Sequence, residues 1–526
     1  MSPQSVDLVY LDPPFNSKRD YNSIYKDHTG RPLPDQVEAY TDTWFLDNER
    51  MRTIKALPKL LREHGVGGHE ADFLAGFISG LVNVQADMAA YLAYMTERLL
   101  WIKWTMKPTA SIYLHCDPTA SHYLKVVLDV VFGRKNFRNE IVWERINSKG
   151  NTYINLANNH DVILRYSKSS KATWNPQYRP YSQEQIERLY KYIEEGTGKR
   201  YKLGDLTNPN RNRPNLTYEF LGITRVWRWS KERMQKAYEE GIVIQRKPGN
   251  VPVQKNYLED AKGNPLSDVW TDINSLRSSS KERLDYATQK PVALLDRIIR
   301  ASSNPGDVVF DPFCGCATTI EAASNLGRNW IGIDITIHAI RRVARRRLGE
   351  RLHLIDGEDY VIDGVPKNWE GAFELWKQDP YQFQKWCVEL VEGFVNVKKT
   401  ADDGIDGRIY FDMPGVKVFQ SMALEVKGGQ NVGPADVGYL NSVLQYENVQ
   451  LAGLITLHQP GNQQTKNFKQ KMALAGDLEI AGRLYPRMQM LTVDEILNGA
   501  KFNMPSPAGR TGTGYERDLF NPPQKL

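Results

Sequence analysis

Two short apolar runs that each end in Asp-Pro constrain the fold of this chain more than any other feature. Val6 to Leu11 is aliphatic and β-branched, and Asp12 and two prolines follow it. About 300 residues later, Asp307 to Phe310 leads in the same way into Asp311 and Pro312. Both runs predict short buried strands that stop where proline interrupts the ladder. Ligands bind at the carboxyl ends of the strands in a doubly wound α/β sheet, so we expect both aspartates at a binding edge.

The first junction has the chemistry to hold a planar amine. Pro13 and Pro14 fix the backbone, so that the Asp12 carboxylate and the Pro13 carbonyl point the same way. Phe15 adds a flat aromatic face beside these two acceptors. A nucleobase with an exocyclic amino group, swung out of its stack, fits this arrangement. The alternative is a strand-ending turn in which Asp12 only caps the backbone.

The second junction predicts a nucleoside site. Small residues fill the loop from Asp311 to Thr319, an apolar helix follows, and Asn329 to Ile335 is a further strand that ends close to Asp334. A loop of small residues lets a ligand approach the backbone, and an acid that ends the next strand can hold ribose hydroxyls. No phosphate-binding Walker pattern accompanies this loop.

These motifs together resemble the β class of DNA amino-methyltransferases, in which the catalytic DPPF precedes the cofactor loop. The resemblance spans roughly residues 6 to 340. The segment YATQKPVALLDRII resembles the family's cofactor-side motif, and His160 to Lys168 resembles its strand near the target base. The family implies a Rossmann-like fold and S-adenosylmethionine as cofactor. Carried over residue by residue, it implies catalytic roles for Asp12, Pro13, Pro14 and Phe15, and cofactor contacts for Lys290, Pro291, Asp311, Phe313, Gly315, Thr318 and Asp334.

The resemblance implies transfer of a methyl group to the exocyclic nitrogen of a flipped base in double-stranded DNA. Asp12 and the Pro13 carbonyl would accept hydrogen bonds from the amino group, and Phe15 would stack on the base. Alignment in a water-poor pocket then supplies most of the acceleration, without a metal or a covalent intermediate. An Asp before the prolines favours adenine (N6), and cytosine (N4) is the alternative.

The sequence departs from the family pattern at two places. The family usually has a strand, loop and helix before DPPF, with an acidic residue near the cofactor adenine. This chain starts a few residues before that strand, so we expect a truncated start, and a DNA-binding pseudo-enzyme with an incomplete cofactor site is an alternative. Ala317 replaces a usual glycine, and it would cost roughly 1 kcal/mol if its φ is positive.

Composition indicates a soluble protein of several domains. A chain of 526 residues is too long for one core, and its formal charge of +6 favours a polyanionic partner without proving one. The N-terminus lacks the pattern of a signal peptide, and polar residues interrupt the apolar stretch from Ala71 to Met95. The four cysteines form neither a CxxC pair nor a zinc pattern. We therefore expect free thiols, a cytoplasmic location and no membrane span, and a homodimer is compatible with the sequence.

The expected organisation divides the chain into four parts. Residues 1–169 and 286–365 form the catalytic domain, and 170–285 form a target-recognition region rich in Arg, Asn, Tyr and Trp. These side chains can read base edges or wedge between bases, although their aromatic rings can equally pack a small core of the insertion. His115 faces the ligand edge or has a purely structural role. The basic helix from Ile340 to Leu352 either binds phosphate or is a solvated face.

Residues 366–500 carry a second candidate chemistry, and a disordered tail of residues 501–526 follows. Tyr381 to Phe394 is an amphipathic helix that contains Glu389, and Asp406 precedes a strand. Glu425 and Lys427 share one face of the next strand because side chains alternate. Asp406, Glu425 and a strand carbonyl can hold Mg²⁺, while Lys427 can orient a water.

This pattern resembles the restriction-endonuclease-like PD-(D/E)xK fold, in its Mrr-like branch. The match implies a nuclease core of Asp406, Glu425 and Lys427, with Glu389 as an accessory acid. Two alternatives are a salt-bridged hairpin and a domain that only grips DNA. The predicted protein is therefore a DNA methyltransferase fused to a Mg²⁺-dependent endonuclease in a restriction-modification system.

Overall fold

The structure is a computed structural model. It describes residues 1–14, 20–23, 37–41, 44–145, 156–277, 280, 282, 289–334, 340, 343–396, 405–411, 413, 419–430, 432–446 and 449–505. Two predictions therefore lie outside the described residues: the placement of Phe15, and the disorder of the tail beyond residue 505.

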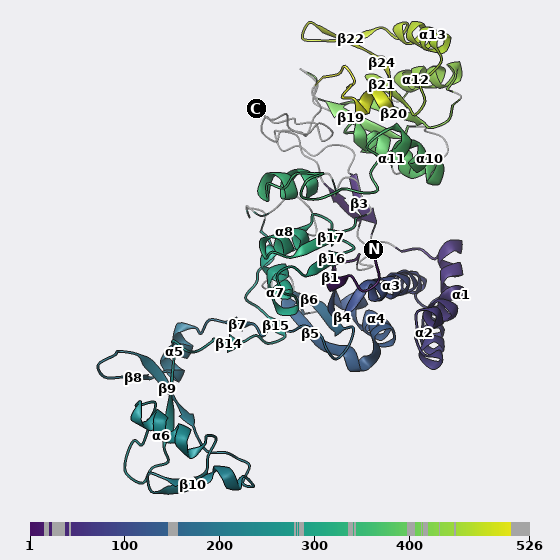
Figure 1. The fold of residues 1–526 in the computed structure, drawn as a ribbon. Coiled ribbons are helices and arrows are strands. Elements are labelled where there is room, and N and C mark those ends of the chain that lie inside the picture. The colour runs from purple at the N-terminus through teal and green to yellow at the C-terminus, as the bar shows by residue number, and fades with distance from the viewer. Residues whose placement is uncertain are drawn as a thin grey trace. The chain divides into compact units, whose positions relative to one another are not determined.

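A seven-stranded sheet forms the centre of the first part of the chain (Figure 1). Its strand order is β15-β5-β6-β4-β1-β16-β17, and every neighbouring pair is parallel except the two that β6 makes. The predicted first strand is confirmed, because β1 covers Val6–Leu11 and is wholly buried. The other strands are β4 (Met106–Cys116), β5 (Phe137–Glu144), β6 (His160–Ser167), β15 (Val269–Trp270), β16 (Val308–Asp311) and β17 (Asn329–Gly332).

Helices cover both faces of this sheet, as predicted for a doubly wound fold. Val9 and Leu11 of β1 belong to one core with residues of α1, α2, α3 and α4, whereas Leu8 and Tyr10 belong to another with residues of α7 and α8. Side chains alternate along a strand, so one six-residue strand supplies both cores. The helices are α1 (Asn48–Glu63), α2 (Gly68–Leu81), α3 (Ala86–Thr105), α4 (Pro118–Leu128), α7 (Val292–Ser302) and α8 (Thr318–Asn325). Smaller elements are β2 (Asp20–Ser23), β3 (Val37–Thr41), η1 (Asp129–Gly133) and η2 (Arg134–Asn136).

The basic segment near residue 345 is helical as predicted, but one of its arginines is neither solvated nor exposed to a ligand. The described part, η4 (Val343–Arg351), is π-helical, and Arg347 is completely buried. The Arg347 guanidinium forms an ion pair with Glu321 of α8. At least one arginine of this segment therefore packs inside the protein, where a buried carboxylate offsets the cost of its charge.

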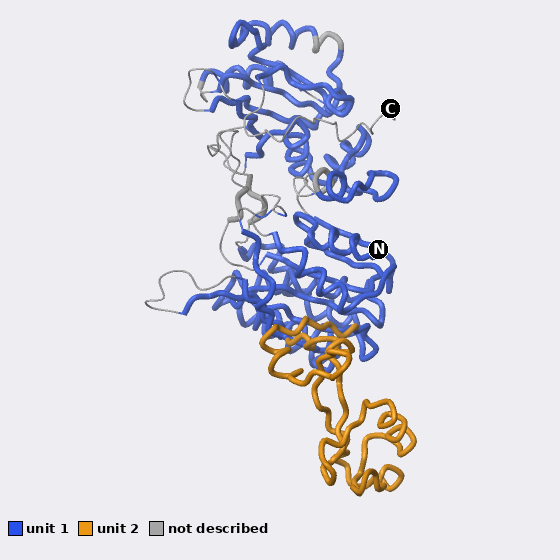
Figure 2. Tube along the Cα trace, turned by 90° about the vertical axis from the view of Figure 1, so that its left-hand side faces the viewer, with its two compact units in different colours: residues 1–174, 268–526 blue, residues 175–267 orange. Residues whose placement is uncertain are grey.

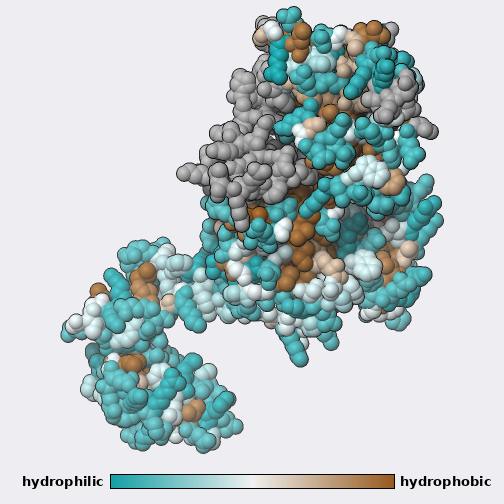
Figure 3. All heavy atoms as spheres, turned by 45° about the horizontal axis from the view of Figure 1, so that its top comes forward, coloured by the Kyte–Doolittle hydropathy of each residue, from teal (hydrophilic) through white to brown (hydrophobic). Residues whose placement is uncertain are grey.

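Residues 175–267 form a separate compact unit (Figure 2). Its largest sheet has the order β12-β13-β9-β8, and its core includes Phe220, Trp227 and Met234. Trp227 is fully buried, so this aromatic packs the unit's own core. The face of this unit that is visible in Figure 3 is mostly hydrophilic, with isolated hydrophobic residues. The elements are β7 (Tyr178–Arg179), α5 (Gln183–Leu189), β8 (Tyr192–Ile193), β9 (Arg200–Asp205), η3 (Pro214–Leu216), β10 (Thr217–Phe220), β11 (Ile223–Val226), α6 (Lys231–Glu239), β12 (Val243–Ile244), β13 (Val253–Tyr257) and β14 (Asn264–Pro265).

A five-stranded mixed sheet lies in the C-terminal part, with the order β18-β19-β20-β21-β24. Apolar cores lie on both of its faces. The predicted helix from Tyr381 to Phe394 is too long, because α11 ends at Leu390 and Phe394 begins β18. The elements are α10 (Trp369–Gln378), α11 (Pro380–Leu390), β18 (Phe394–Val395), β19 (Gly407–Phe411), β20 (Gln420–Lys427), α12 (Pro434–Tyr446), β21 (Leu451–Thr456), α13 (Asn462–Ala473), β22 (Asp477–Ile480), β23 (Arg483–Pro486), β24 (Met488–Thr492) and α14 (Val493–Leu497).

The described helices include none with the length and apolar character needed to cross a lipid bilayer.

Candidate active site

The two Asp-Pro junctions lie side by side at one edge of the central sheet. In the parallel pair of β1 and β16, Val9 is opposite Phe310, so that the residues after both strands lie at the same edge. Asp12 is also close enough to Asp311 for its charge to raise the pKa of the Asp311 carboxyl. The sequence-based expectation that these distant segments converge is therefore confirmed. Pro13 is buried and Pro14 half-buried beside Asp12.

Lys290 is the direct partner of Asp12. Its Nζ lies 2.8 Å from Asp12 Oδ1 and 2.6 Å from Oδ2, although the two residues are 278 positions apart. Both side chains are largely shielded from solvent. The next residue, Pro291, is the N-cap of α7, so the start of that helix places Lys290 at the sheet edge. The family motif implied a cofactor contact for Lys290, and the structure adds this ion pair with the candidate catalytic acid.

The loop after β16 is held by two aspartates. Asp311 Oδ1 accepts a hydrogen bond from the Phe313 N–H at 3.0 Å, and its Oδ2 accepts one from the Thr319 hydroxyl at 2.5 Å. Asp334 Oδ2 accepts from the Gly315 N–H at 2.8 Å. One oxygen of the acid predicted to hold ribose therefore braces the loop. Thr319, which the sequence analysis did not select, makes the contact with Asp311.

The remaining cofactor candidates lie within or beside this loop. The Thr318 hydroxyl is buried 3.5 Å from the sulfur of Cys316, and the Phe313 ring packs partly against the core. Ala317 has φ of 56° and ψ of 38°, so it adopts the left-handed conformation for which the sequence analysis expected a cost. A Cβ at Gly332 would lie 2.5 Å from Ile320 Cδ1 and 3.3 Å from Cys314 Cβ, so a larger residue there would displace the side chains packed between β17 and α8.

Acidic side chains gather at this edge beside the Lys290 ammonium. Burial, with a smaller contribution from the charges of Asp12 and Asp334, raises the pKa of Asp311 to about 7, although its hydrogen bonds to Thr319 and Phe313 oppose the rise. Three acidic groups in one small region favour a positively charged ligand. The sulfonium of S-adenosylmethionine carries such a charge.

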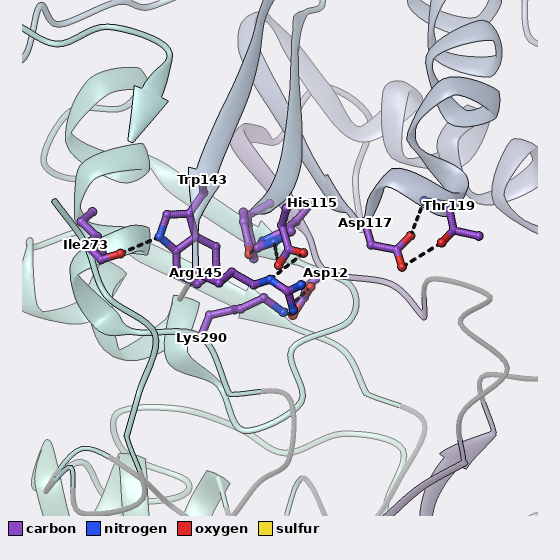
Figure 4. Close-up of polar contacts among 10 residues, drawn as sticks. Asp12, His115, Asp117, Thr119, Trp143, Arg145, Ile273 and Lys290 are labelled. Carbon is purple, nitrogen blue, oxygen red and sulfur yellow. Dashed lines mark hydrogen bonds and ion pairs between the residues drawn. The ribbon is translucent and has the colours of Figure 1, made fainter. Parts of the chain in front are cut away.

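A polar network that the sequence analysis missed lies behind Asp12 (Figure 4). The Tyr10 hydroxyl lies 2.8 Å from His115 Nδ1, and His115 Nε2 lies 3.0 Å from Asp161 Oδ2. Asp161 Oδ1 forms an ion pair with Arg145 Nε at 3.0 Å. His115 is completely buried with both ring nitrogens engaged, which supports the structural alternative for this residue. The network joins three strands that are far apart in the sequence, so no local sequence pattern predicted it.

The C-terminal candidates also come together. β19 and β20 are antiparallel, and Asp406 Oδ2 accepts a hydrogen bond from the Val426 N–H at 2.7 Å. Lys427 Nζ lies 2.8 Å from Glu425 Oε1 and 3.4 Å from Asp436 Oδ1. The predicted shared face of Glu425 and Lys427 is confirmed. Asp436, at the start of α12, is an additional acid that the sequence analysis did not select.

This cluster fits a cation only in part. Burial raises the pKa of both Asp406 and Glu425, although Lys427 opposes the shift, and Glu425 Oε2 is buried with no hydrogen-bond partner among the described residues. A cation would satisfy that oxygen. However, the described residues contain no group of three or more His, Cys, Asp or Glu side chains arranged to hold a metal ion. Glu389 lies on α11, which packs against β20.

Fold and site together define the protein class. The chain belongs to the DNA methylase family whose members modify N6 or N4, because residues 6–345 match the family model. Among its relatives, it is 35% identical over 292 residues to the type II methyltransferase M.EcaI of Enterobacter cloacae, covering 55% of this chain and 63% of that protein. It is 26% identical over 348 residues to the Mod subunit of the type III restriction-modification enzyme StyLTI of Salmonella typhimurium, covering 61% of this chain and 47% of that subunit.

A shorter match and a solved structure complete the comparison. Over 116 residues the chain is 40% identical to the DNA adenine methyltransferase YhdJ of Escherichia coli, covering 20% of this chain and 38% of that enzyme. The chain thus spans less than two thirds of each of these three relatives. The M1.HpyAVI structure with S-adenosylmethionine aligns with 65% of this chain and 90% of its own at 16% identity, with a TM-score of 0.28, which is too low for a comparison of sites.

Proposed function

We propose that this protein transfers a methyl group from S-adenosylmethionine to the N6 amino group of adenine in double-stranded DNA. The observation that carries this proposal is the convergence of Asp12, with its Lys290 partner, and the Asp311 loop at one sheet edge. One segment offers acceptors for an amine, and the other offers a loop braced by the acids Asp311 and Asp334 for a positively charged cofactor. Family membership and the partial match to an adenine methyltransferase support the assignment.

Asp12 and Lys290 have different roles in binding the amino group: Asp12 accepts its hydrogen bond, and Lys290 orients Asp12. A carboxylate has about four lone-pair sites, so Asp12 can bind Lys290 and still accept a hydrogen bond from the amino group. The ion pair also limits the rotation of Asp12 and so aligns the amine for attack. When bound, S-adenosylmethionine supplies the electrophilic methyl group. The amino nitrogen would bond to the methyl carbon as the sulfur–methyl bond breaks and S-adenosylhomocysteine leaves, and Asp12 would accept the proton that the nitrogen loses.

Methyl transfer to DNA tests the proposal directly. Tritiated S-adenosylmethionine and mixed-sequence DNA are incubated with the wild type, Asp12→Asn and the control Asp72→Asn, which changes an exposed acid on α2. Asp12→Asn should lose nearly all transfer while it keeps cofactor binding, and the control should retain wild-type activity. Equal label from the wild type and Asp12→Asn would remove the catalytic role of Asp12.

Identifying the product base separates adenine from cytosine. Digestion of the labelled DNA should yield N6-methyladenine, whereas N4-methylcytosine would replace our assignment by the cytosine alternative. Cofactor binding by this exact chain, measured by calorimetry, decides between an enzyme and a DNA-binding pseudo-enzyme. Failure of the wild type to bind S-adenosylmethionine would favour the second.

We propose as a second function that the C-terminal part cuts DNA with Mg²⁺. The antiparallel strands bring Asp406, Glu425 and Lys427 together, and the buried Glu425 oxygen needs a partner. Asp406 and Glu425 would hold the ion, which would stabilise charge at the scissile phosphate, and Lys427 would orient a water. Plasmid cutting should require Mg²⁺ and disappear in Lys427→Ala but persist in Lys471→Ala on α13. Absence of cutting by the wild type on methylated and unmethylated plasmid would leave DNA binding as the function of this part.

A further inference from the structure

Arg145 is a charged residue at the candidate active site, and it has no role in the proposed methyl transfer itself. It follows β5 directly, and β5 runs parallel to β4 and β1 in direction, so its carboxyl end lies at the edge that carries Asp12. Figure 4 shows the Arg145 side chain extending from this end toward Asp12 and Lys290. We propose that Arg145 binds a backbone phosphate of the DNA substrate beside the target base; this inference rests on the proposed methyltransferase function.

Within the described part of the chain, the Arg145 side chain forms an ion pair with one acid. Its Nε contacts Asp161 Oδ1 at 3.0 Å, and Asp161 is its only ion-pair partner among the residues that the structure describes. This ion pair engages Nε, without the geometry of a hydrogen bond, so the two terminal nitrogens, with four N–H donors, can bind another ligand. The Arg145 side chain is 37% exposed, whereas that of Asp161 is 2% exposed. The anchor is therefore inside the protein and the donor end reaches solvent.

Stability alone does not explain the buried polar residues that hold Asp161, the partner of Arg145. Asp161 is buried, and His115 and Tyr10 behind it are buried as well, in a chain of polar contacts across three strands. Buried ionic groups usually add little stability, and apolar residues of similar size often serve as well or better. A chain of this kind does fix the orientation of the group at its end. Here that group is the partly exposed Arg145.

Charge and geometry identify the ligand as a phosphate. The Asp12 carboxylate contacts the Lys290 ammonium through both of its oxygens, so Lys290 is already engaged with the candidate catalytic acid. A planar guanidinium can donate two parallel hydrogen bonds to phosphate oxygens, which the single ammonium group of a lysine cannot do. A flipped nucleotide would bring its own phosphates to the same edge as its base. Arg145 would then hold the displaced backbone while Asp12 engages the amino group.

DNA binding measured against salt concentration tests this assignment. A labelled mixed-sequence duplex is titrated with full-length wild type, Arg145→Gln and the control Arg134→Gln, which removes an exposed charge in η2 at the opposite end of β5. Arg145→Gln should weaken binding about tenfold at low salt and reduce the slope of log K against log salt by about one. Affinity for S-adenosylmethionine should stay at the wild-type value, and the Arg134→Gln slope should not change.

A second variant separates the phosphate contact from a merely structural role. Asp161→Asn keeps the Arg145 charge but loosens its anchor, so KM for DNA should rise while the salt slope stays near wild type. An Arg145→Gln slope equal to wild type overturns the inference, and so does a loss of S-adenosylmethionine affinity with unchanged DNA binding. Weakened binding of only some sequences would mean base reading and would also overturn it. If the wild type itself binds no DNA, the proposed function fails instead.

Discussion

Replacement of Asp311 by Asn should change how the stability of the methyltransferase domain depends on pH. Asp311 is 3% exposed, and burial, with the nearby charges of Asp12 and Asp334, raises its pKa to about 7. An unfolded Asp titrates near 3.8. The folded state therefore binds the proton more tightly, and stability falls as pH rises from about 4 to about 7. Asn has no proton to lose, and it can still accept from the Phe313 N–H and bond to the Thr319 hydroxyl.

The size of the effect follows from the shift. Each pH unit between the two pKa values corresponds to about 1.4 kcal/mol, so the wild type should lose about 2.7 kcal/mol between pH 5 and pH 8 through this group. Asp311→Asn escapes that loss. Its free energy of unfolding relative to wild type should rise by this amount over the same range. For a domain of this size the difference corresponds to about 5 to 10 °C in Tm.

Calorimetry of the full chain at pH 5, 6, 7 and 8 measures the effect. The methyltransferase transition is recognised as the one that S-adenosylmethionine shifts, because a chain with several domains does not unfold in one step. Asp72→Asn provides the control for loss of a carboxylate at an exposed position. A Tm difference between wild type and Asp311→Asn that stays constant from pH 5 to pH 8 would refute the reasoning.

Three further substitutions test other parts of the structure. Gly332→Ala should lower the free energy of unfolding by about 1–3 kcal/mol and weaken cofactor binding, because the new Cβ would lie 2.5 Å from Ile320. An unchanged Tm and an unchanged affinity for S-adenosylmethionine in calorimetry would contradict this. Ala317→Gly should change the free energy of unfolding by no more than about 1 kcal/mol. Glycine relieves the left-handed strain, but it also raises the entropy of the unfolded chain and removes a buried methyl group. A larger change in urea unfolding would contradict this. Glu425→Gln should stabilise the C-terminal part more at pH 8 than at pH 5, because burial raises the pKa of Glu425, and thermal unfolding at both pH values checks the sign.

Local sequence patterns predicted the strands and loops that carry the candidate chemistry. The apolar run from Val6 to Leu11 and the prolines after it predicted the end of β1 before Asp12, whereas β16 was predicted one residue early, because it covers Val308–Asp311. The two-residue alternation of a strand likewise places Glu425 and Lys427 on one face. These features depend on neighbouring residues and on backbone geometry, which is why they can be read without a structure.

The partners of these residues depended on contacts between distant segments. The pairing of Lys290 with Asp12, the chain from Tyr10 through His115 to Asp161, and the burial of Arg347 all require the strand order and the helix positions. Nothing in the neighbouring sequence specifies them, because each contact joins residues far apart in the chain whose approach is decided by the packing of the whole sheet. The sequence alone therefore determined that Asp12 and the Asp311 loop follow strands of the ligand edge, and the tertiary structure decided which further groups join them, which are bound to each other and which face solvent.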